Sequence, residues 1–122
     1  SFITSLIPRF RAVIYVPGNH EYYENDKFDV DAHWLKFENV HKGKFFYLHG
    51  GESVKIDDTW FLGATMWTDM YKENPMLMID YTIYMNDCNQ IKWMGENWNS
   101  LIPVFVHYSY PERLIFELQT IP

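Results

Sequence analysis

The sequence is poor in cysteine, in positive charge and in long apolar runs. Its single Cys88 excludes an internal disulfide framework and favours a reducing compartment, which predicts a cytoplasmic location. Ten Lys and Arg stand against sixteen Asp and Glu, and the net charge of −6 argues against broad binding to nucleic acid or anionic membranes. No apolar run reaches the length of a membrane span, and no signal-peptide pattern opens the chain.

Apolar residues are plentiful in spite of these absences. Hydrophobic side chains make up 48% of the 122 residues and aromatic ones 19%, which is ample for a packed core and too apolar for a disordered chain. No repeat, low-complexity tract or linker divides the sequence. The length fits one domain or part of a larger one, and we expect residues 1–122 to form a single domain.

Alternation of strand-like and helix-like segments predicts an α/β fold. Asp57-Asp58 between two apolar runs predicts a hairpin, and His41-Lys42-Gly43 is typical of a helix end. Residues 108–122 show no pattern that we can assign. Strands are expected at 12–16, 45–48, 53–56, 59–66 and 103–107, and helices at 1–7, at 28–40 and within 76–94.

Polar side chains follow the first predicted strand directly, in the segment RAVIYVPGNHEYY at 11–23. Pro17-Gly18 ends the strand, and Asn19, His20 and Glu21 carry groups that bind metal or move protons. Open α/β sheets usually place their sites at such strand ends. Pro-Gly-Asn is also an ordinary turn, and in isolation that is the simpler interpretation because Gly and Asn tolerate positive φ.

Three segments, in matching order, give the sequence a family resemblance. VPGNHE at 16–21 resembles the strand-to-GNH[D/E] segment of calcineurin-like metallophosphoesterases. WFLGATMWTD at 60–69 resembles the FLGATLWTD segment of a subgroup of predicted phosphoesterases, and MND at 85–87, followed by Ile91, resembles the next segment of that subgroup. The resemblance extends over roughly residues 11–92.

The resemblance implies a partial version of the family's α/β sandwich, a mixed sheet with flanking helices, and a phosphoester substrate. It also implies two divalent metal ions (Mn, Fe or Zn), which activate water and stabilise phosphoryl charge. Asn19 would then be a neutral ligand to the second metal, and His20 would stabilise the phosphoryl group or protonate the leaving oxygen. Gly18 would support the turn, while Glu21 would orient His20 or cap the next segment.

The segment WFLGATMWTD is expected to serve packing, without a chemical role. Phe61, Leu62 and Met66 suit a buried strand, and Asp69 suits a turn or a helix cap.

Much of the family's metal site has no counterpart in the sequence. The family motifs DxH, GDxxD and GHxH are missing as site segments, since Asp31-Ala32-His33 spells DxH inside a predicted helix, where both side chains should be solvated. His41 and His49 occur singly at turns and fit surface roles. His107 ends an apolar run, and it is either the family's later lone metal ligand or a plain strand-end histidine.

Two functions therefore remain. The first is a metal-dependent phosphoester hydrolase, present here as an incomplete or degenerate copy whose site is completed by missing segments or another chain. The alternative is a catalytically inactive binding or interaction module, a pseudoenzyme, that uses exposed sheet edges to pair with a second copy or a partner chain. A nucleic-acid-binding module conflicts with the acidic charge unless its basic residues are confined to one patch.

Overall fold

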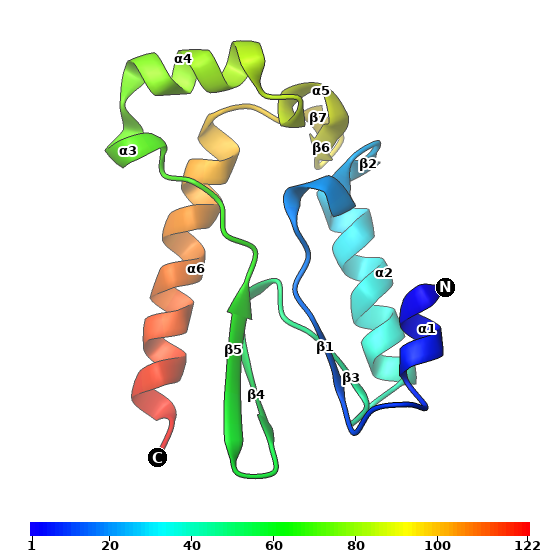
Figure 1. The fold of residues 1–122 in the computed structure, drawn as a ribbon. Helices are drawn as coiled ribbons and strands as arrows, with labels where there is room; N and C mark the ends of the chain where they lie inside the picture. The colour runs from blue at the N-terminus through cyan, green and yellow to red at the C-terminus, as the bar shows by residue number, and fades with distance from the viewer.

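The computed structural model describes residues 1–110 and 112–122, and it confirms the mixed α/β class. Most helices and strands are short, and only α2 and α6 exceed three turns (Figure 1). In chain order the elements are α1 Phe2–Leu6, β1 Val13–Tyr15, η1 Asn19–Tyr22, β2 Asn25–Asp26, α2 Lys27–Val40, β3 Phe45–Tyr47, β4 Gly50–Ile56, β5 Thr59–Ala64, α3 Met70–Glu73, α4 Pro75–Tyr84, α5 Asp87–Gln90, β6 Ile91–Trp93, β7 Glu96–Asn97 and α6 Leu101–Thr120.

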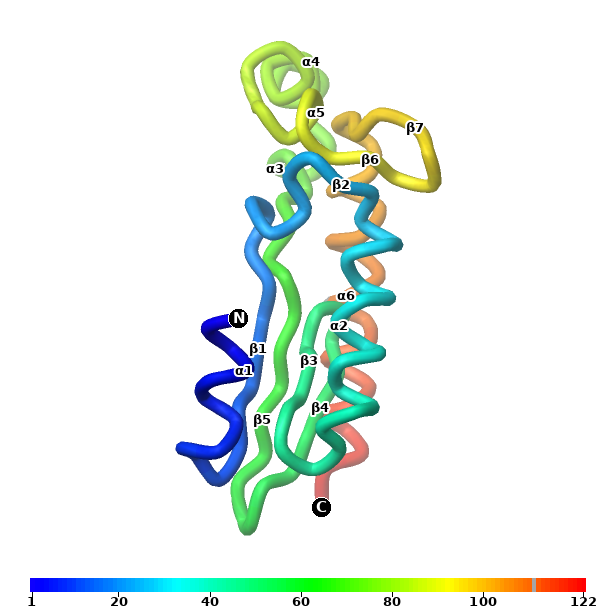
Figure 2. The backbone as a smooth tube through the Cα atoms, turned by 90° about the vertical axis from the view of Figure 1, so that its right-hand side faces the viewer, coloured from blue at the N-terminus to red at the C-terminus, as the bar shows by residue number. Residues whose placement is uncertain are grey.

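The strands form three small sheets. β1 pairs in parallel with β3 across the α2 connection, β4 and β5 form an antiparallel hairpin, and β2, β6 and β7 form a third sheet. Figure 2 shows α2 and α6 on one side of the strands of the first two sheets and α1 on the other. No helix in the described part of the chain combines the length and the apolar character needed to cross a bilayer.

The main hydrophobic core lies where η1, β6 and the segment after β5 meet α3, α4 and the first turns of α6. Trp98 is its largest fully buried side chain, and its ring centroid lies 4.7 Å from that of Trp67. Aromatic pairs of this kind add stabilisation beyond the area that they bury. The buried members of this core are Tyr22, Trp67, Met70, Tyr81, Ile91, Trp98, Val104 and Val106.

Most helices and strands that the local sequence predicts are confirmed. β1, α1, α2 and β3 lie where the sequence predicts them, and the hairpin turns at Asp57, whose φ is 54°. Asp69 caps α3, because its carboxylate accepts a hydrogen bond from the Tyr71 N–H at 3.0 Å. The helix expected within residues 76–94 occurs as α4 followed by the single turn α5.

The strand predicted at 103–107 is wrong, because these residues lie in the first turns of α6. Pro103 is compatible with this position, since the first turn of a helix does not need its N–H. α6 packs along β4, where Tyr110 touches the position that a Cβ on Gly50 would take, at 3.1 Å. Gly51 has a φ of +92°, and a Cβ at this position would lie 2.9 Å from the Tyr110 carbonyl oxygen, so the lack of a side chain leaves room for that oxygen. This tertiary contact overrides the strand preference of the local sequence.

The burial predicted for WFLGATMWTD is wrong at two positions. Phe61 is 39% exposed and Met66 is 85% exposed, whereas Leu62 is half-buried. Phe61 lies in the hairpin, whose strands pair with each other in the described structure, and Met66 follows the end of β5. The segment therefore contributes less to the core than its apolar composition suggests.

Asp31, predicted to be solvated, instead lies at the centre of a mostly buried polar cluster. Its Oδ1 accepts hydrogen bonds from the hydroxyls of Tyr22 (2.9 Å) and Tyr47 (2.7 Å), and Lys27 Nζ lies 2.6 Å from its Oδ2. Lys27 is only 3% exposed, so its ammonium needs this partner. His33, the other half of the Asp-Ala-His sequence, is exposed as predicted.

His49 also differs from its predicted surface role. Its ring stacks on Tyr47 with centroids 4.8 Å apart and is half-buried. Its Nδ1 lies 3.1 Å from Glu52 Oε1 without the alignment of a hydrogen bond, and its Nε2 lies 3.9 Å from Asp31 Oδ2. His49 thus extends the Asp31 cluster from α2 to β4.

The buried ion pair between Lys27 and Asp31 should contribute far more to the free energy of unfolding than the exposed pair between Arg11 and Asp57. We expect Asp31→Asn to lower the free energy of unfolding by roughly 3–5 kcal/mol, because it leaves the buried Lys27 ammonium without a counter-charge. Arg11→Ala removes an exposed ion pair with Asp57 and should change the free energy of unfolding by less than about 1 kcal/mol. Urea unfolding of both variants checks this, and an equal cost for the two would contradict it.

Candidate functional site

The turn after β1 places the Gly18–Glu21 segment at the end of the strand. Pro17 is buried, Gly18 has extended backbone, and the chain then enters the single turn η1 at Asn19. The Glu21 carboxylate folds back toward Gly18, with Oε2 3.0 Å from the position that a Cβ on residue 18 would take. β1 therefore ends in a tight turn that directs polar groups away from the sheet, as the sequence predicts.

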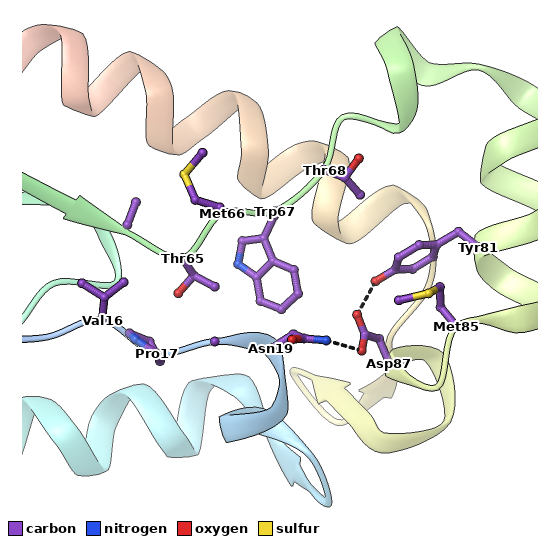
Figure 3. A pocket seen from close by; sticks show the side chains of 12 residues that line it. Val16, Pro17, Asn19, Thr65, Met66, Trp67, Thr68, Tyr81, Met85 and Asp87 are labelled. Atoms are coloured by element: carbon purple, nitrogen blue, oxygen red, sulfur yellow. Dashed lines mark hydrogen bonds between the residues drawn. The ribbon is translucent and has the colours of Figure 1, made fainter. Parts of the chain in front are cut away.

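A cleft of about 470 Å³ opens beside this turn (Figure 3). One wall is the end of β1 with its turn, the second is the segment after β5, and the third comes from α4 and the start of α5. These walls contain parts of the three segments that carry the family resemblance. The lining residues are Val16, Pro17, Gly18, Asn19, Ala64, Thr65, Met66, Trp67, Thr68, Tyr81, Met85 and Asp87.

Gly63 allows the first two walls to approach each other. A Cβ at this position would lie 2.8 Å from Leu48 Cβ and 3.0 Å from Val16 Cγ2, closer than side chains tolerate. The β-hairpin can therefore pack directly against the end of β1 and the chain after β3. The glycine of the WFLGATMWTD segment thus has a positioning role, although it carries no chemical group.

Asp87 is the charged group of the cleft. It is 2% exposed, and within the described residues no Lys, Arg or His forms an ion pair with it. Its Oδ1 accepts hydrogen bonds from Asn19 Nδ2 at 2.9 Å and the Tyr23 hydroxyl at 2.7 Å, and its Oδ2 accepts one from the Tyr81 hydroxyl at 2.8 Å. Hydrogen bonds to a charged group contribute roughly 1.5–3 kcal/mol each, which offsets its loss of water.

The buried Asp87 carboxylate raises the pKa values of neighbouring side chains. Burial and then the hydrogen bond to Asp87 raise the pKa of Tyr23 to about 12. Burial also raises the pKa of Tyr81, and Asp87 raises it further. The pKa of the Cys88 thiol is raised first by burial and second by the Asp87 charge, so Cys88 is not an activated nucleophile.

The structure brings only part of the predicted site residues together. Asn19 and Gly18 line the cleft, whereas His20 and Glu21 are exposed on η1 and do not line it. His20 packs its ring against Tyr23 with centroids 4.4 Å apart. The chemistry that the resemblance implies for His20 would therefore take place at the rim of the cleft.

His107 lies on α6, which Figure 3 shows on the far side of the Thr65–Thr68 segment from Asn19. Its Nδ1 lies 2.7 Å from the Trp67 carbonyl oxygen, which accepts a hydrogen bond when that nitrogen is protonated. It also faces a small apolar cavity of about 50 Å³ with Tyr110 and Leu114. In this structure His107 contacts the back of one cleft wall.

Sequence reasoning missed Asp87 and Trp67. Asp87 lies in the MND segment that carries part of the resemblance, but the resemblance assigns it no role. Trp67 closes the cleft with its indole, and its Nε1 is buried without a hydrogen-bond partner in the described chain. An unpaired polar atom of this kind is uncommon in a folded protein and marks a place where a ligand or water can bind after a small rearrangement.

The described residues do not by themselves fit a two-metal centre. They contain no group of three or more His, Cys, Asp and Glu side chains close enough to hold a metal ion. Asn19 Oδ1 is the one family-type ligand that the cleft offers, because its Nδ2 is used by Asp87. A complete centre would need further ligands from outside residues 1–122.

Among known proteins, the chain is similar to a viral protein. An uncharacterized protein of Acanthamoeba polyphaga mimivirus is 30% identical over 99 residues, which cover 79% of this chain and 34% of the viral protein. The chain thus spans about a third of the length of the curated relative that it matches. No family model and no solved structure matches the chain.

The raised tyrosine pKa values predict a loss of stability in alkali. Tyr15 and Tyr23 both have pKa values of about 12 in the folded state and near 10 in the unfolded chain. Their contribution is fully present below pH 10 and is lost as pH rises toward 12, because the unfolded state releases these protons first. The free energy of unfolding, measured by urea titration, should therefore fall between about pH 10 and pH 12.

Tyr23→Phe is the matched variant for this prediction. It removes one of the two titrating hydroxyls, so the decline over the same interval should become shallower. Equal free energies of unfolding at about pH 9 and about pH 12 in the native protein would contradict the prediction.

Proposed function

We propose that this chain forms part of a metal-dependent phosphoester hydrolase related to the calcineurin-like metallophosphoesterases. The observation that carries the proposal is the cleft itself. Residues from all three resembling segments, 16–19, 64–68 and 85–87, line one hollow, although Asn19 and Asp87 within it are 68 positions apart in the chain. Convergence of the three segments on one cleft is what a shared function would require. The single cysteine favours a reducing, cytoplasmic setting for this activity.

The fold is compatible with a portion of the family's α/β sandwich. The parallel β1–β3 pair carries α2, and the β4–β5 hairpin lies beside it with α6 packed on β4. In this proposal DxH, GDxxD and GHxH, which the sequence lacks as site segments, come from chain outside residues 1–122 or from another chain. Those segments would add strands beside the short sheets described here.

Each site residue then has a defined task. Asn19 presents a neutral carboxamide oxygen to the cleft, which binds a cation without cancelling its charge. His20, at the rim, holds or gives a proton at its ring nitrogen when a substrate oxygen leaves. Two divalent ions, when bound, would supply an activated hydroxide and charge stabilisation. The substrate is a phosphoester.

The alternative, an inactive interaction module, is favoured by a separate observation. Within the described chain, α4 and α6 expose many large apolar side chains, and no three metal-ligating groups cluster. Exposed apolar helix faces are typical of surfaces that another chain or domain covers. A second copy or a partner chain would then be the binding partner. Exposed apolar residues on these two helices include Met76, Ile79, Ile83, Leu101, Phe105, Ile115 and Phe116.

The coding frame around this chain tests the proposal directly. Sequencing the complete transcript should reveal DxH and GDxxD ahead of Ser1 and GHxH beyond Pro122. The protein expressed from that frame should bind about two Mn²⁺ ions and hydrolyse an aryl phosphate ester. A complete frame without these motifs, together with no stoichiometric metal and no turnover, would reject the hydrolase and leave the interaction module.

Asn19→Ala tests the role of the cleft within that protein. It removes a metal ligand and should weaken Mn²⁺ binding by at least tenfold, measured by isothermal titration calorimetry, with a parallel loss of turnover. Asn39→Ala, an exposed asparagine on α2, is the matched control and should change neither. Unchanged Mn²⁺ affinity in Asn19→Ala would mean that the GNHE segment is only a turn.

A further inference from the structure

The first turns of α6 carry large apolar side chains that the described structure leaves exposed. Leu101 and Phe105 are each 65% exposed, and Tyr108 is 43% exposed. Their spacing of four and then three residues places them on one side of the helix. α6 therefore presents an apolar stripe that has no partner in the described part of the chain.

Two hollows flank this stripe. The first has a volume of about 440 Å³ and lies between α3 and α6. The second has a volume of about 310 Å³ and is bordered by Trp93 of β6. Leu101 and Phe105 line both hollows, so they form a ridge between two depressions. Helices pack by placing ridges of side chains into grooves, so this shape fits another helix.

The first hollow, which we call the α6 groove, is bordered by negative charge. Glu73 of α3 and Glu112 of α6 line it, and within the described residues neither forms an ion pair. Partial burial, and then the charges of Glu73 and Asp69, raise the pKa of Tyr108, which also lines the α6 groove. An apolar groove with carboxylates at its borders complements an apolar surface with cations at its borders.

An unusual backbone holds Glu73 beside the α6 groove. The four residues of α3 have φ between 52° and 60°, so this turn is left-handed although it contains no glycine. Such conformations are costly and persist only where the surrounding structure holds them. Met70 is 5% exposed and anchors the turn in the core, and the Glu73 N–H donates to the Asp69 carbonyl at 2.8 Å. The strained turn thus fixes a carboxylate at the groove.

From these observations we propose that the α6 groove binds a basic amphipathic helix of another protein, whose apolar face covers Leu101 and Phe105 and whose Lys or Arg residues face Glu73 and Glu112. A second copy of this chain fits less well. Each copy has a net charge of −6, and a symmetric contact through this face would bring the same carboxylates together. The α6 groove shares no lining residue with the cleft, so this binding is independent of the proposed hydrolase.

Synthetic helices test the binding directly. The labelled peptide LKKLLKLLKKLLKL has leucines on one helix face and lysines on the other, and it should bind the native chain in a fluorescence anisotropy titration. The peptide LEELLELLEELLEL has the same apolar face with glutamates, and it should bind at least about tenfold more weakly because like charges repel. Absence of binding by the lysine peptide, or equal binding of the two peptides, would overturn the proposal.

Phe105→Ala tests whether the peptide lies on the ridge. It should weaken binding of the lysine peptide by at least about tenfold, as the loss of a central aromatic contact does. Phe116→Ala is the matched control, because Phe116 is 62% exposed on the same helix and lines neither hollow. It should change the affinity less than about twofold. Both side chains are exposed, so both variants should fold, and equal losses of affinity would contradict a site at the ridge.

The carboxylates are tested by Glu73→Gln and Glu112→Gln combined in one chain. This variant should weaken binding of the lysine peptide by roughly fivefold and make the affinity less sensitive to salt. Glu24→Gln combined with Asp58→Asn removes the same net charge from exposed positions outside the α6 groove, and it should change the affinity less than about twofold. Equal effects of the two variants would mean that overall charge, and not the groove, attracts the peptide.

The oligomeric state decides between a basic partner and a second copy. In sedimentation equilibrium the native chain without peptide should be a monomer. A dimer that Phe105→Ala dissociates and Phe116→Ala leaves intact would refute the basic partner, because a second copy would then occupy the α6 groove.

Discussion

A carboxylate removed from water has to be surrounded by hydrogen-bond donors. In this structure that requirement brings η1 and α4 together around Asp87 at the start of α5. Asp87 accepts hydrogen bonds from Asn19 of η1, from Tyr23 just after η1 and from Tyr81 of α4. Trp98 in turn donates a hydrogen bond to the Tyr81 hydroxyl. Segments that are distant in sequence must therefore meet at one point. The cleft exists because these segments, together with the chain after β5, converge there without filling the space between them.

A second buried centre, around Asp31, joins α2 to η1 and β3 in a different way. Asp31 is paired with the Lys27 ammonium and bonded by two tyrosine hydroxyls, so its charge is neutralised as well as hydrogen-bonded. Asp87 has neutral donors only. A neutralised carboxylate suits a structural role, whereas an uncompensated negative charge beside a cleft favours a cation nearby. The contrast supports placing the functional site at Asp87 and not at the Asp31 cluster.

Local signals predicted β1, α2 and the hairpin because Pro17-Gly18, Gly43 and Asp57-Asp58 act on their immediate neighbours. The sequence does not predict α6, because α6 packs through Tyr110 against the glycines of β4, which lie some sixty residues earlier and are not visible in the local pattern. Asn19 was visible as a site candidate from its own segment. The sequence assigns no role to Asp87, because its partner Asn19 lies 68 positions away. It also predicts a solvated Asp31, although Lys27 stands only four residues away, because nothing local indicates that α2 buries this pair against Tyr22 and Tyr47.

The hydrogen bond between Asn19 and Asp87 joins residues 68 positions apart. A contact of such long sequence separation must offset the entropy of closing the loop between its two residues. During synthesis the Asn19 turn therefore leaves the ribosome well before its partner exists. The cleft can be completed only once α5 and Trp98 have emerged, so a nascent or truncated chain that ends before them would display the turn without a fixed carboxamide.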